Sequence, residues 1–187
     1  MTYVILAAGS SSRMGFAKVF TPLGTGGPPL ERIARLLHGR RCVVVVPPDR
    51  LDDARSMAPA ARVVANGEPE RGMAHSLRLA LGEIAVGEDF AVMLGDKPFL
   101  RAETLDALEG ELRDADVAYP VASDSTPGHP VLFAAIARER ALHLPDGDAI
   151  FTLRDDPALR SRRVRIDDPG AFADLDAPSE WEAAADA

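Results

Sequence analysis

The sequence predicts an α/β domain in which a mostly parallel sheet is covered by helices on both faces. Short apolar runs rich in strand-forming residues alternate along the chain with segments of helical periodicity. Some runs are continuously apolar, as in Cys42–Val46, which is typical of parallel strands buried on both faces. The chain has 187 residues, enough for one well-packed domain and rather few for two. We therefore expect one domain over residues 1–187.

Seven strands are expected from the apolar runs. The first, Val4–Leu6, is followed by small residues where the chain must turn, and the second is closed by Pro47 and Pro48. The third ends at an Asn-Gly turn, and the fourth, Phe90–Leu94, is apolar throughout. In order, the expected strands cover residues 4–6, 42–46, 63–65, 90–94, 117–121, 130–133 and 163–166.

Helices are expected between these strands. Apolar residues recur at helical spacing from Leu30 to Leu37, and Gly39 follows as a C-cap. A second apolar stripe, from Met73 to Ile84, is expected to belong to the core. The expected helices cover residues 30–37, 51–57, 73–84, 104–112, 134–144, a short segment opened by residues 146–148, and 177–187.

Composition and charge restrict the classes of function. The formal net charge is −8 and aromatic residues make up 5% of the chain, which argues against nucleic-acid and anionic-membrane binding. No apolar run approaches the roughly 20 residues of a membrane span. The single Cys42 excludes an internal disulfide. The chain begins at its first strand without a targeting peptide, so we expect a cytoplasmic protein.

The residues after the first strand predict an anion-binding loop. Ala7–Gly9 remove side-chain bulk at the turn, and Ser10–Ser12 offer hydroxyls and a helix N-cap. Such a loop points backbone N–H groups toward a helix N-terminus, and Arg13 and Lys18 add two positive charges. The spacing matches neither a Walker loop nor a dinucleotide fingerprint. A solvated turn with two solubilising cations therefore stays open as the alternative.

Asp96 is the most informative single residue, because ligands of parallel sheets bind beyond the carboxyl ends of the strands. It directly follows the fourth strand, and Mg²⁺ prefers carboxylate oxygens together with substrate phosphates. N-capping is the alternative, but residues 97–99 separate Asp96 from the next helix. Asp174 and Asp176 stand at alternate positions of an extended stretch, which puts both on one face. One of them is a candidate second ligand, although Asp176 alone also suits an N-cap.

Other polar residues are weaker candidates for ligand contact or catalysis. His129 lies between a polar loop and a strand, where it can contact a second substrate, and Asp148 lies in a later loop. His75, at a helix start, is a candidate for ligand contact. The sequence shows no zinc spacing of His with Cys or carboxylates and no Gly-x-Ser-x-Gly nucleophile elbow. We therefore expect neither a zinc site nor Ser-His-Asp catalysis.

Five short motifs, in order along nearly the whole chain, resemble those of the MobA-like nucleotidyltransferases. These enzymes attach a nucleotide to molybdenum cofactor and belong to a wider group that makes sugar and alditol nucleotides. The resemblance implies a three-layer Rossmann-like domain of the nucleotide-diphospho-sugar transferase type. The motifs are Leu6-Ala-Ala-Gly-Ser-Ser-Ser-Arg-Met-Gly15 with Lys18, Asn66-Gly67 with Gly72-Met-Ala-His-Ser-Leu77, Leu94-Gly-Asp-Lys-Pro98, Gly128-His-Pro-Val-Leu-Phe133 and Asp174-Leu-Asp-Ala-Pro178.

The resemblance also implies a role for each matching residue, with Arg13, Lys18 and Asp96 at the centre of catalysis. Nucleotidyl transfer depends mostly on positioning and charge neutralisation, and an acceptor that is already a phosphate needs no general base. By role, the residues are Ala7, Ala8, Gly9, Asn66, Gly72 and Ser76 for the base and ribose, Ser10, Arg13 and Lys18 for the triphosphate, Asp96 with Asp174 or Asp176 for Mg²⁺, and His129 and Asp148 for the acceptor.

Within the family, Ala-Ala-Gly in the first loop accompanies cytidylyl enzymes and Ala-Gly-Gly guanylyl enzymes. The methyl group of Ala8 therefore implies CTP, with GTP as the alternative, since one methyl group discriminates by only about 1–3 kcal/mol.

This chain departs from the family pattern at three places. Lys97 stands where Gln or Met is expected, and its ammonium could bind phosphate or weaken Mg²⁺ binding by repulsion. His75 replaces a small residue, and the loop Gly147–Ile150 lacks a second Gly.

Three functions remain open from the sequence. The first is a Mg²⁺-dependent cytidylyltransferase acting on molybdopterin, the organic part of molybdenum cofactor. The second is a nucleotidyltransferase for another acceptor, such as a sugar or alditol phosphate. The third is a non-catalytic nucleotide-binding module that delivers cofactor to a molybdoenzyme or a cofactor-insertion chaperone. The departures at Lys97 and at Ala149–Ile150 are the main support for this third function.

Overall fold

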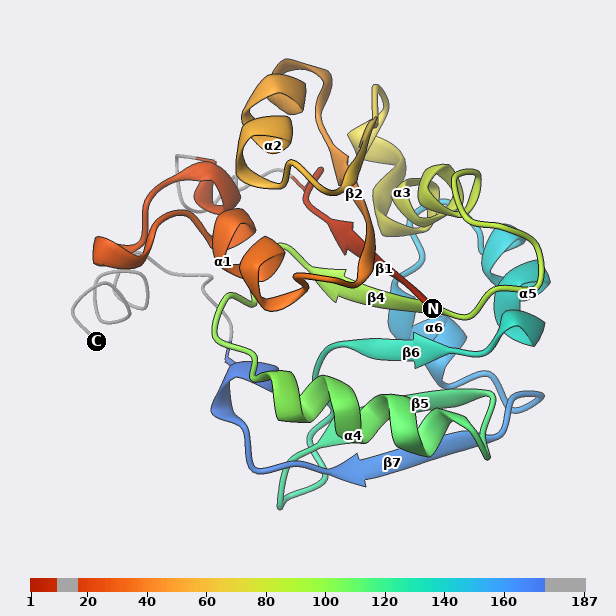
Figure 1. Cartoon of the computed structure of the whole chain (residues 1–187). Coiled ribbons are helices and arrows are strands. Elements are labelled where there is room, and N and C mark those ends of the chain that lie inside the picture. Colours follow the sequence, from red (N-terminus) through yellow and green to blue (C-terminus); the bar gives the residue numbers. More distant parts are fainter. Residues whose placement is uncertain (10–16, 174–187) are drawn as a thin grey trace.

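The computed structural model describes residues 1–9 and 17–173. Within them, seven strands form one sheet in the order β3-β2-β1-β4-β6-β5-β7 (Figure 1). Neighbouring strands are parallel except at β6, which runs antiparallel to both β4 and β5. The prediction of a mostly parallel sheet is confirmed. The strands are β1 Thr2–Leu6, β2 Arg41–Val46, β3 Arg62–Ala65, β4 Phe90–Leu94, β5 Val117–Val121, β6 Val131–Phe133 and β7 Ser161–Arg165.

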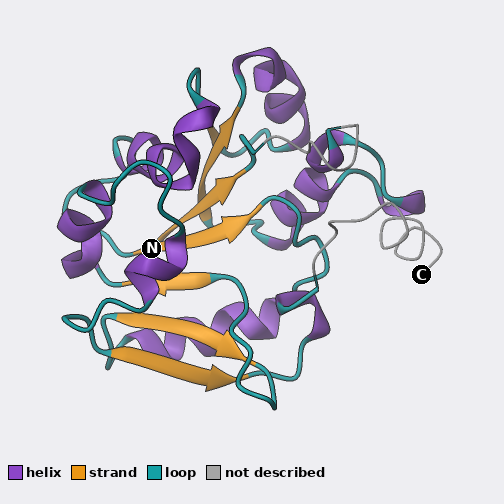
Figure 2. Ribbon diagram, turned by 180° about the vertical axis from the view of Figure 1, so that it is seen from behind, coloured by secondary structure: helices purple, strands orange, loops and turns teal. Residues whose placement is uncertain are grey.

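Helices cover both faces of the sheet (Figure 2). Successive residues of a strand point to opposite faces, so Val4 and Ile5 belong to two different hydrophobic clusters. One cluster includes apolar residues of α1, α2 and α4, and the other includes those of α3, α5 and α6. These helices are α1 Pro29–Leu36, α2 Leu51–Met57, α3 Gly72–Leu81, α4 Ala102–Leu112, α5 Arg138–Leu142 and α6 Ile150–Arg154.

Two of the expected helices are shorter than the periodicity suggests. The helix expected over residues 73–84 ends at Leu81, whose carbonyl accepts a hydrogen bond from Arg138 Nη2 at 2.6 Å. The helix expected over 134–144 begins as a 3-10 turn, Ala135–Ala137, before α5. Here Asp89 Oδ1 accepts from the Ala135 N–H at 2.9 Å, which fixes the start of the turn. The helix start expected after the serines of the first loop and the helix expected over 177–187 lie outside the described residues.

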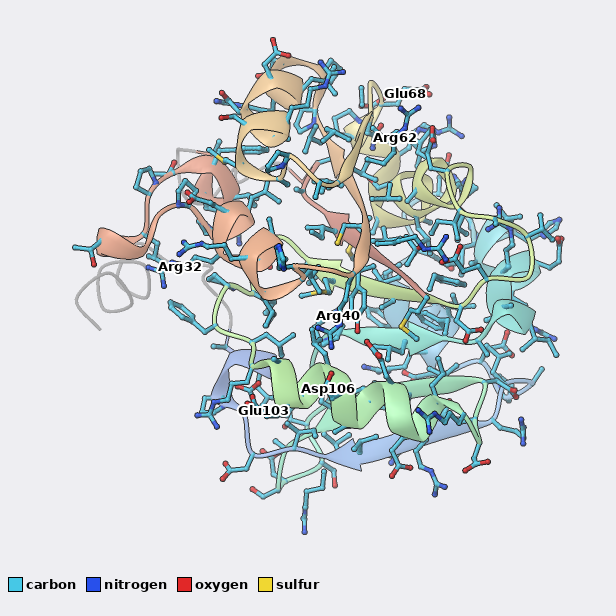
Figure 3. The ribbon with its side chains drawn as sticks, in the orientation of Figure 1. Arg32, Arg40, Arg62, Glu68, Glu103 and Asp106 are labelled. Carbon is cyan, nitrogen blue, oxygen red and sulfur yellow. The ribbon has the colours of Figure 1, made fainter. Side chains whose placement is uncertain are left out.

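Ion pairs tie helices together on the α1 and α4 side of the sheet. Arg40, between α1 and β2, points toward Asp106 of α4, as Figure 3 shows, and its Nε lies 3.2 Å from Glu109 Oε1. The same guanidinium lies over the ring of the buried Tyr3. These contacts lie away from the carboxyl ends of β1 and β4, and they join α4 to the segment between α1 and β2.

The reversed strand β6 brings a second set of residues to the edge of the sheet at which β4 ends. Because β6 pairs with β4 antiparallel, Val131 lies opposite Val92 and Phe133 opposite Phe90. The residues that precede β6, His129 and the cis-bonded Pro130, therefore reach the edge at which β4 ends. The carboxyl ends of β1 and β4 and the amino end of β6 share one edge of the sheet.

Candidate nucleotide-binding site

A pocket of about 370 Å³ opens at the carboxyl ends of β1 and β4. It brings together residues from four separate parts of the sequence, including six that the sequence singled out for nucleotide binding. Its position follows the rule for open α/β sheets, in which ligands bind beyond the carboxyl ends of the strands. The lining residues are Leu6, Ala7, Ala8, Gly9, Lys18, Val19, Pro69, Gly72, Met73, Ser76, Leu94, Gly95 and Asp96.

The first wall of the pocket is the segment that leaves β1. The Ala7 N–H donates to the Val45 carbonyl at 2.9 Å, so the backbone continues the sheet for one more residue. The side chains of Ala7 and Ala8 are almost fully buried. A Cβ on Gly95 would lie 3.2 Å from the Ala7 methyl group and 3.1 Å from Val19. Because these residues are small, the segments that follow β1 and β4 pack closely against each other beside the pocket.

The second wall is the amino end of α3. Gly72 begins this helix with φ +85, a left-handed conformation that favours glycine, and a Cβ there would lie 3.2 Å from Gly147 Cα. The first turn of α3 carries no acidic residue and no side-chain cap. Its amide groups and the positive end of the helix dipole are therefore suited to an electronegative ligand group.

Asn66 supports the pocket from behind. Its side chain is fully buried, and its Nδ2 donates to Ser76 Oγ at 2.9 Å. Its Oδ1 accepts from the Glu68 N–H at 2.8 Å, which closes the turn after β3. Asn66 is not among the pocket-lining residues. The geometry gives it the task of orienting Ser76, which does line the pocket.

Lys18 and Asp96 form the charged centre of the pocket. Lys18 Nζ lies 2.6 Å from Asp96 Oδ2, and both side chains are largely buried at 12% and 18% exposure. The pair joins the segment after β1 to the end of β4, which lie 78 positions apart. The sequence predicted both residues for this site, and the fold brings them into contact.

The second oxygen of Asp96 fits a metal ligand. Asp96 Oδ1 is buried and accepts no hydrogen bond within the part of the chain that the structure describes. A buried carboxylate oxygen with no donor is costly unless a cation or another donor reaches it. Among the described residues no three His, Cys, Asp or Glu side chains cluster as a metal site. Asp96 can supply one ligand, and Mg²⁺ takes its remaining ligands from few carboxylates, water and substrate phosphates.

Lys97 points away from this centre. Its side chain is buried, and Nζ donates to the Ala173 carbonyl at 2.7 Å and lies 3.4 Å from the Phe172 carbonyl. It is not among the pocket-lining residues, unlike its neighbour Asp96.

The residues expected on the acceptor side do not line the pocket themselves. The His129 N–H donates to the Ala171 carbonyl at 2.9 Å, at the edge shared with β4. Asp148 follows Gly147, whose N–H donates to the Arg71 carbonyl at 3.0 Å, directly beside the start of α3. His75 lies 3.7 Å from Glu68 Oε2 and is likewise absent from the lining. Both acceptor candidates therefore lie next to elements that line the pocket.

Sequence reasoning assigned Met73 wrongly to the buried stripe of α3. Met73 is 38% exposed and lines the pocket, because the first residues of a helix have no preceding turn for their side chains to cover. Pro69 and Val19 also line the pocket without having been singled out, and nothing in their residue types marks a site. Ser10, Arg13, Asp174 and Asp176 lie outside the described residues.

The sequence and the fold both resemble those of known proteins. A family model described as the MobA-like NTP transferase domain matches residues 3–161. The chain is 39% identical over 116 residues to the bifunctional protein GlmU of Ralstonia pickettii, covering 59% of this chain and 25% of that protein. The chain thus spans about a quarter of that relative's length.

Solved structures share the fold at low sequence identity. Rv0371c of Mycobacterium tuberculosis H37Rv superposes with a TM-score of 0.83 at 21% identity, covering 100% of this chain and 98% of that one. A manganese complex of Rv0371c gives 0.80 at 18% identity, with coverage of 100% and 98%. Molybdopterin-guanine dinucleotide biosynthesis protein A of Archaeoglobus fulgidus gives 0.74 at 19% identity, covering 100% and 97%.

In the described ranges, no helix has the length and apolar character needed to cross a membrane. The family match covers most of the chain, and the segments it includes build the pocket between β1, α3 and β4. The chain belongs to the MobA-like NTP transferase family.

Proposed function

We propose that this protein transfers a nucleotidyl group from a nucleoside triphosphate to a phosphorylated acceptor. The first candidates are CTP as donor, molybdopterin as acceptor and Mg²⁺ as the metal. The observation that carries this proposal is the Lys18–Asp96 pair, set in a pocket walled by Ala7–Gly9 and the amino end of α3. An ammonium group and a carboxylate with a buried free oxygen are the groups that a metal–triphosphate complex requires.

In the proposed reaction an oxygen of the acceptor phosphate attacks the α-phosphorus of the triphosphate. The bond between the α-phosphorus and the oxygen that bridges to the β-phosphorus breaks, and pyrophosphate leaves with that electron pair. Lys18 supplies positive charge to the phosphate oxygens, and Asp96 binds the divalent cation. When bound, Mg²⁺ neutralises charge on the triphosphate. Ser10 and Arg13 for the triphosphate, and Asp174 or Asp176 for the metal, complete the proposed set.

CTP is proposed as donor because Ala-Ala-Gly accompanies cytidylyl enzymes in the family, and because Ala8, which lines the pocket, adds a methyl group where the edge of a base would approach the backbone. GTP is the alternative, since one methyl group shifts such a preference by only about 1–3 kcal/mol. Molybdopterin is proposed as acceptor on the motifs of the family, and the likeness to GlmU keeps sugar and alditol phosphates as the alternative. His129 and Asp148, on the rim next to the pocket, are the proposed acceptor contacts.

The proposal is tested by measuring pyrophosphate release with each of four nucleoside triphosphates, Mg²⁺ and either molybdopterin or a panel of sugar and alditol phosphates. We expect CTP with molybdopterin to give the fastest release. Asp96→Asn should slow it about 10³-fold or more, because a metal ligand accounts for several kcal/mol of transition-state stabilisation.

Two outcomes would redirect the proposal. Fastest release with a sugar or alditol phosphate would reassign the acceptor while keeping the nucleotidyl chemistry. Tight nucleotide binding without release under any combination would instead favour a cofactor-delivery module.

A further inference from the structure

Met73 is the large apolar side chain that α3 presents to the nucleotide pocket. It is 38% exposed and belongs to the lining. Three further large hydrophobic residues of the described ranges are also exposed, and they do not line this pocket: Val86, Ile136 and Phe151. An exposed apolar side chain in the wall of a pocket stays in contact with water until a ligand covers it, and covering it favours binding.

The wall formed by α3 is polar at its inner end and apolar at its outer end. Met73 and Ser76 are three residues apart, so they lie on the same face of the helix. Ser76 is buried, and its Oγ accepts a hydrogen bond from Asn66 Nδ2, so its own proton can be donated to a ligand. Met73 and the exposed Pro69 form the outer part of the wall. The wall thus offers a ligand one hydrogen bond and an apolar surface.

The charged residues of the described lining stand apart from this wall. Lys18 follows β1 and Asp96 follows β4, and the two side chains pair at 2.6 Å. In a nucleoside triphosphate the negative charge lies on the phosphates, whereas the base is flat and uncharged at neutral pH. The phosphates therefore suit the charged centre, and the base suits the wall formed by α3.

The described lining contains no aromatic side chain on which a base could stack. Methionine can replace an aromatic ring in this role, because its thioether is polarizable and packs favourably against ring systems. We propose that Met73 covers one face of the nucleobase and holds the base in the pocket. This inference rests on the proposed function. It separates Met73 from Ala8, whose methyl group would meet the edge of the base.

A contact with the face of the base predicts an equal loss of affinity for different nucleotides, since every base has such a face. Met73→Ala should bind CTP and GTP about 10-fold more weakly, because the base can no longer bury a methionine side chain. Met73→Leu keeps a side chain of similar volume and should stay within about 3-fold of the wild-type affinity. Isothermal titration calorimetry of the full chain with Mg²⁺ measures these constants.

Ile136→Ala is the matched control for this substitution. It also shortens an exposed apolar side chain, at 68% exposure, and Ile136 follows β6 at the edge of the sheet where β4 begins. The pocket lies at the edge where β4 ends. We therefore expect Ile136→Ala to bind both nucleotides with wild-type affinity.

Oxidation of the wild-type protein gives a second readout. Hydrogen peroxide transfers one oxygen atom to the thioether, which yields methionine sulfoxide and water, and a covered side chain reacts more slowly. Peptide mass spectrometry should show that CTP slows the oxidation of Met73, whereas inorganic tripolyphosphate at the same concentration does not. Met57, the last residue of α2, is not in the described lining and should oxidise at the same rate with and without CTP.

Unchanged CTP affinity in Met73→Ala, or a loss of affinity for only one of the two nucleotides, would overturn the contact with the face of the base. Equal protection of Met73 by tripolyphosphate and by CTP, or Met73→Leu as weak as Met73→Ala, would overturn it too. Each of these outcomes leaves the proposed function intact. Wild-type protein that binds neither CTP nor GTP would instead overturn the proposed function itself.

Discussion

The proposed nucleotide side and the proposed acceptor side of the site are built in different ways. The nucleotide side stands on four parallel strands, β3, β2, β1 and β4, and two of its walls follow directly from the ends of β1 and β4. The acceptor side depends on the reversed strand β6 and on loops held together across long sequence separations, such as Arg71 with Asp146. One side is thus fixed by the sheet, and the other by contacts between loops.

This difference affects how each side can change. A residue at the end of a parallel strand is held by the hydrogen bonds of the sheet. A loop held by ion pairs and close backbone contacts moves when one of those contacts is lost.

Gly72→Ala should have the largest effect, because Gly72 is where the two sides touch. The new methyl group would lie 3.2 Å from Gly147 Cα and 3.3 Å from Gly147 N, at a φ of +85 that alanine adopts only with strain. We expect the free energy of unfolding to fall by about 2 kcal/mol or more. Urea unfolding measures this loss, and nucleotide affinity should fall with it.

Gly110→Ala is the matched control for that substitution. Gly110 lies in α4, and a Cβ there would meet no atom within 4 Å. Alanine should therefore stabilise the protein by about 0.5–1 kcal/mol through helix propensity. If Gly72→Ala were as stable as Gly110→Ala, the contact between the two sides would not be close.

Ser76→Ala tests the nucleotide side alone. It removes the hydroxyl oxygen that accepts a hydrogen bond from Asn66 Nδ2 at 2.9 Å, and it leaves the fully buried Asn66 amide without that partner. We expect a loss of about 1–3 kcal/mol in the free energy of unfolding, measured from denaturant midpoints. The double variant with Asn66→Ala should lose less than the sum of the two single losses, since both remove one shared bond. Strict additivity would contradict the role of Asn66 in orienting Ser76.

Asp146→Asn tests the acceptor side. Asp146 Oδ2 accepts from Arg71 Nε at 2.8 Å, and Oδ1 is paired with Arg78, so the carboxylate fastens the loop before Asp148 to α3. We expect the KM for the acceptor to rise a few-fold while the KM for the nucleotide stays unchanged. Asp52→Asn, which breaks an exposed pair with Arg55 in α2, is the control and should change neither constant.

The pH dependence of the acceptor KM gives a second check. Hydrogen bonds from Arg71 hold the pKa of Asp146 below its ordinary value. A lowered pKa means that the carboxylate stays ionised in the folded protein, and that the pairing is lost only as the pH falls through this lowered value. The acceptor KM should therefore show no dependence on Asp146 between about pH 5 and 8. A rise at about pH 6 that disappears in Asp146→Asn would contradict the pairing, whereas a rise that persists in this variant belongs to the acceptor phosphate, which itself ionises at about pH 6.

The two sides also differ in how far the sequence predicted them. The strand ends could be predicted, because apolar runs and turn residues are local signals. The position of the pocket-lining residues near these ends could be predicted with them, namely Ala7–Gly9, Lys18 and Asp96. The direction of β6 could not, since pairing between distant strands leaves no mark in a three-residue strand.

The direction of the Lys97 side chain could not be predicted either. A motif places a residue in the chain, but its hydrogen bond to the Ala173 carbonyl depends on how a segment 76 positions away is folded. Asn66 shows the same limit, because its residue type suits both a ligand contact and the buried turn in which it lies.

The smallest effect is expected from substitution of Cys42. This substitution tests whether function is confined to the edge of the sheet at which β1 and β4 end. Cys42 lies near the start of β2, at the opposite edge of the sheet, and lines a separate pocket of about 190 Å³ between the ends of α1 and α2. Burial raises the pKa of its thiol to about 11. At pH 7.5 the thiol is protonated, so iodoacetamide should alkylate it about 100-fold more slowly than an exposed cysteine.

The raised pKa also fixes the sign of a stability change. The unfolded thiol ionises near pH 9 and the folded thiol only near pH 11, so ionisation favours the unfolded chain between these values. Wild-type stability should therefore fall over this range relative to Cys42→Ser, as measured by urea unfolding at pH 8 and pH 10.5. Because Cys42 is remote from the pocket at the ends of β1 and β4, Cys42→Ser should leave turnover unchanged. A loss of turnover without a loss of stability would show that the amino edge also contributes to function.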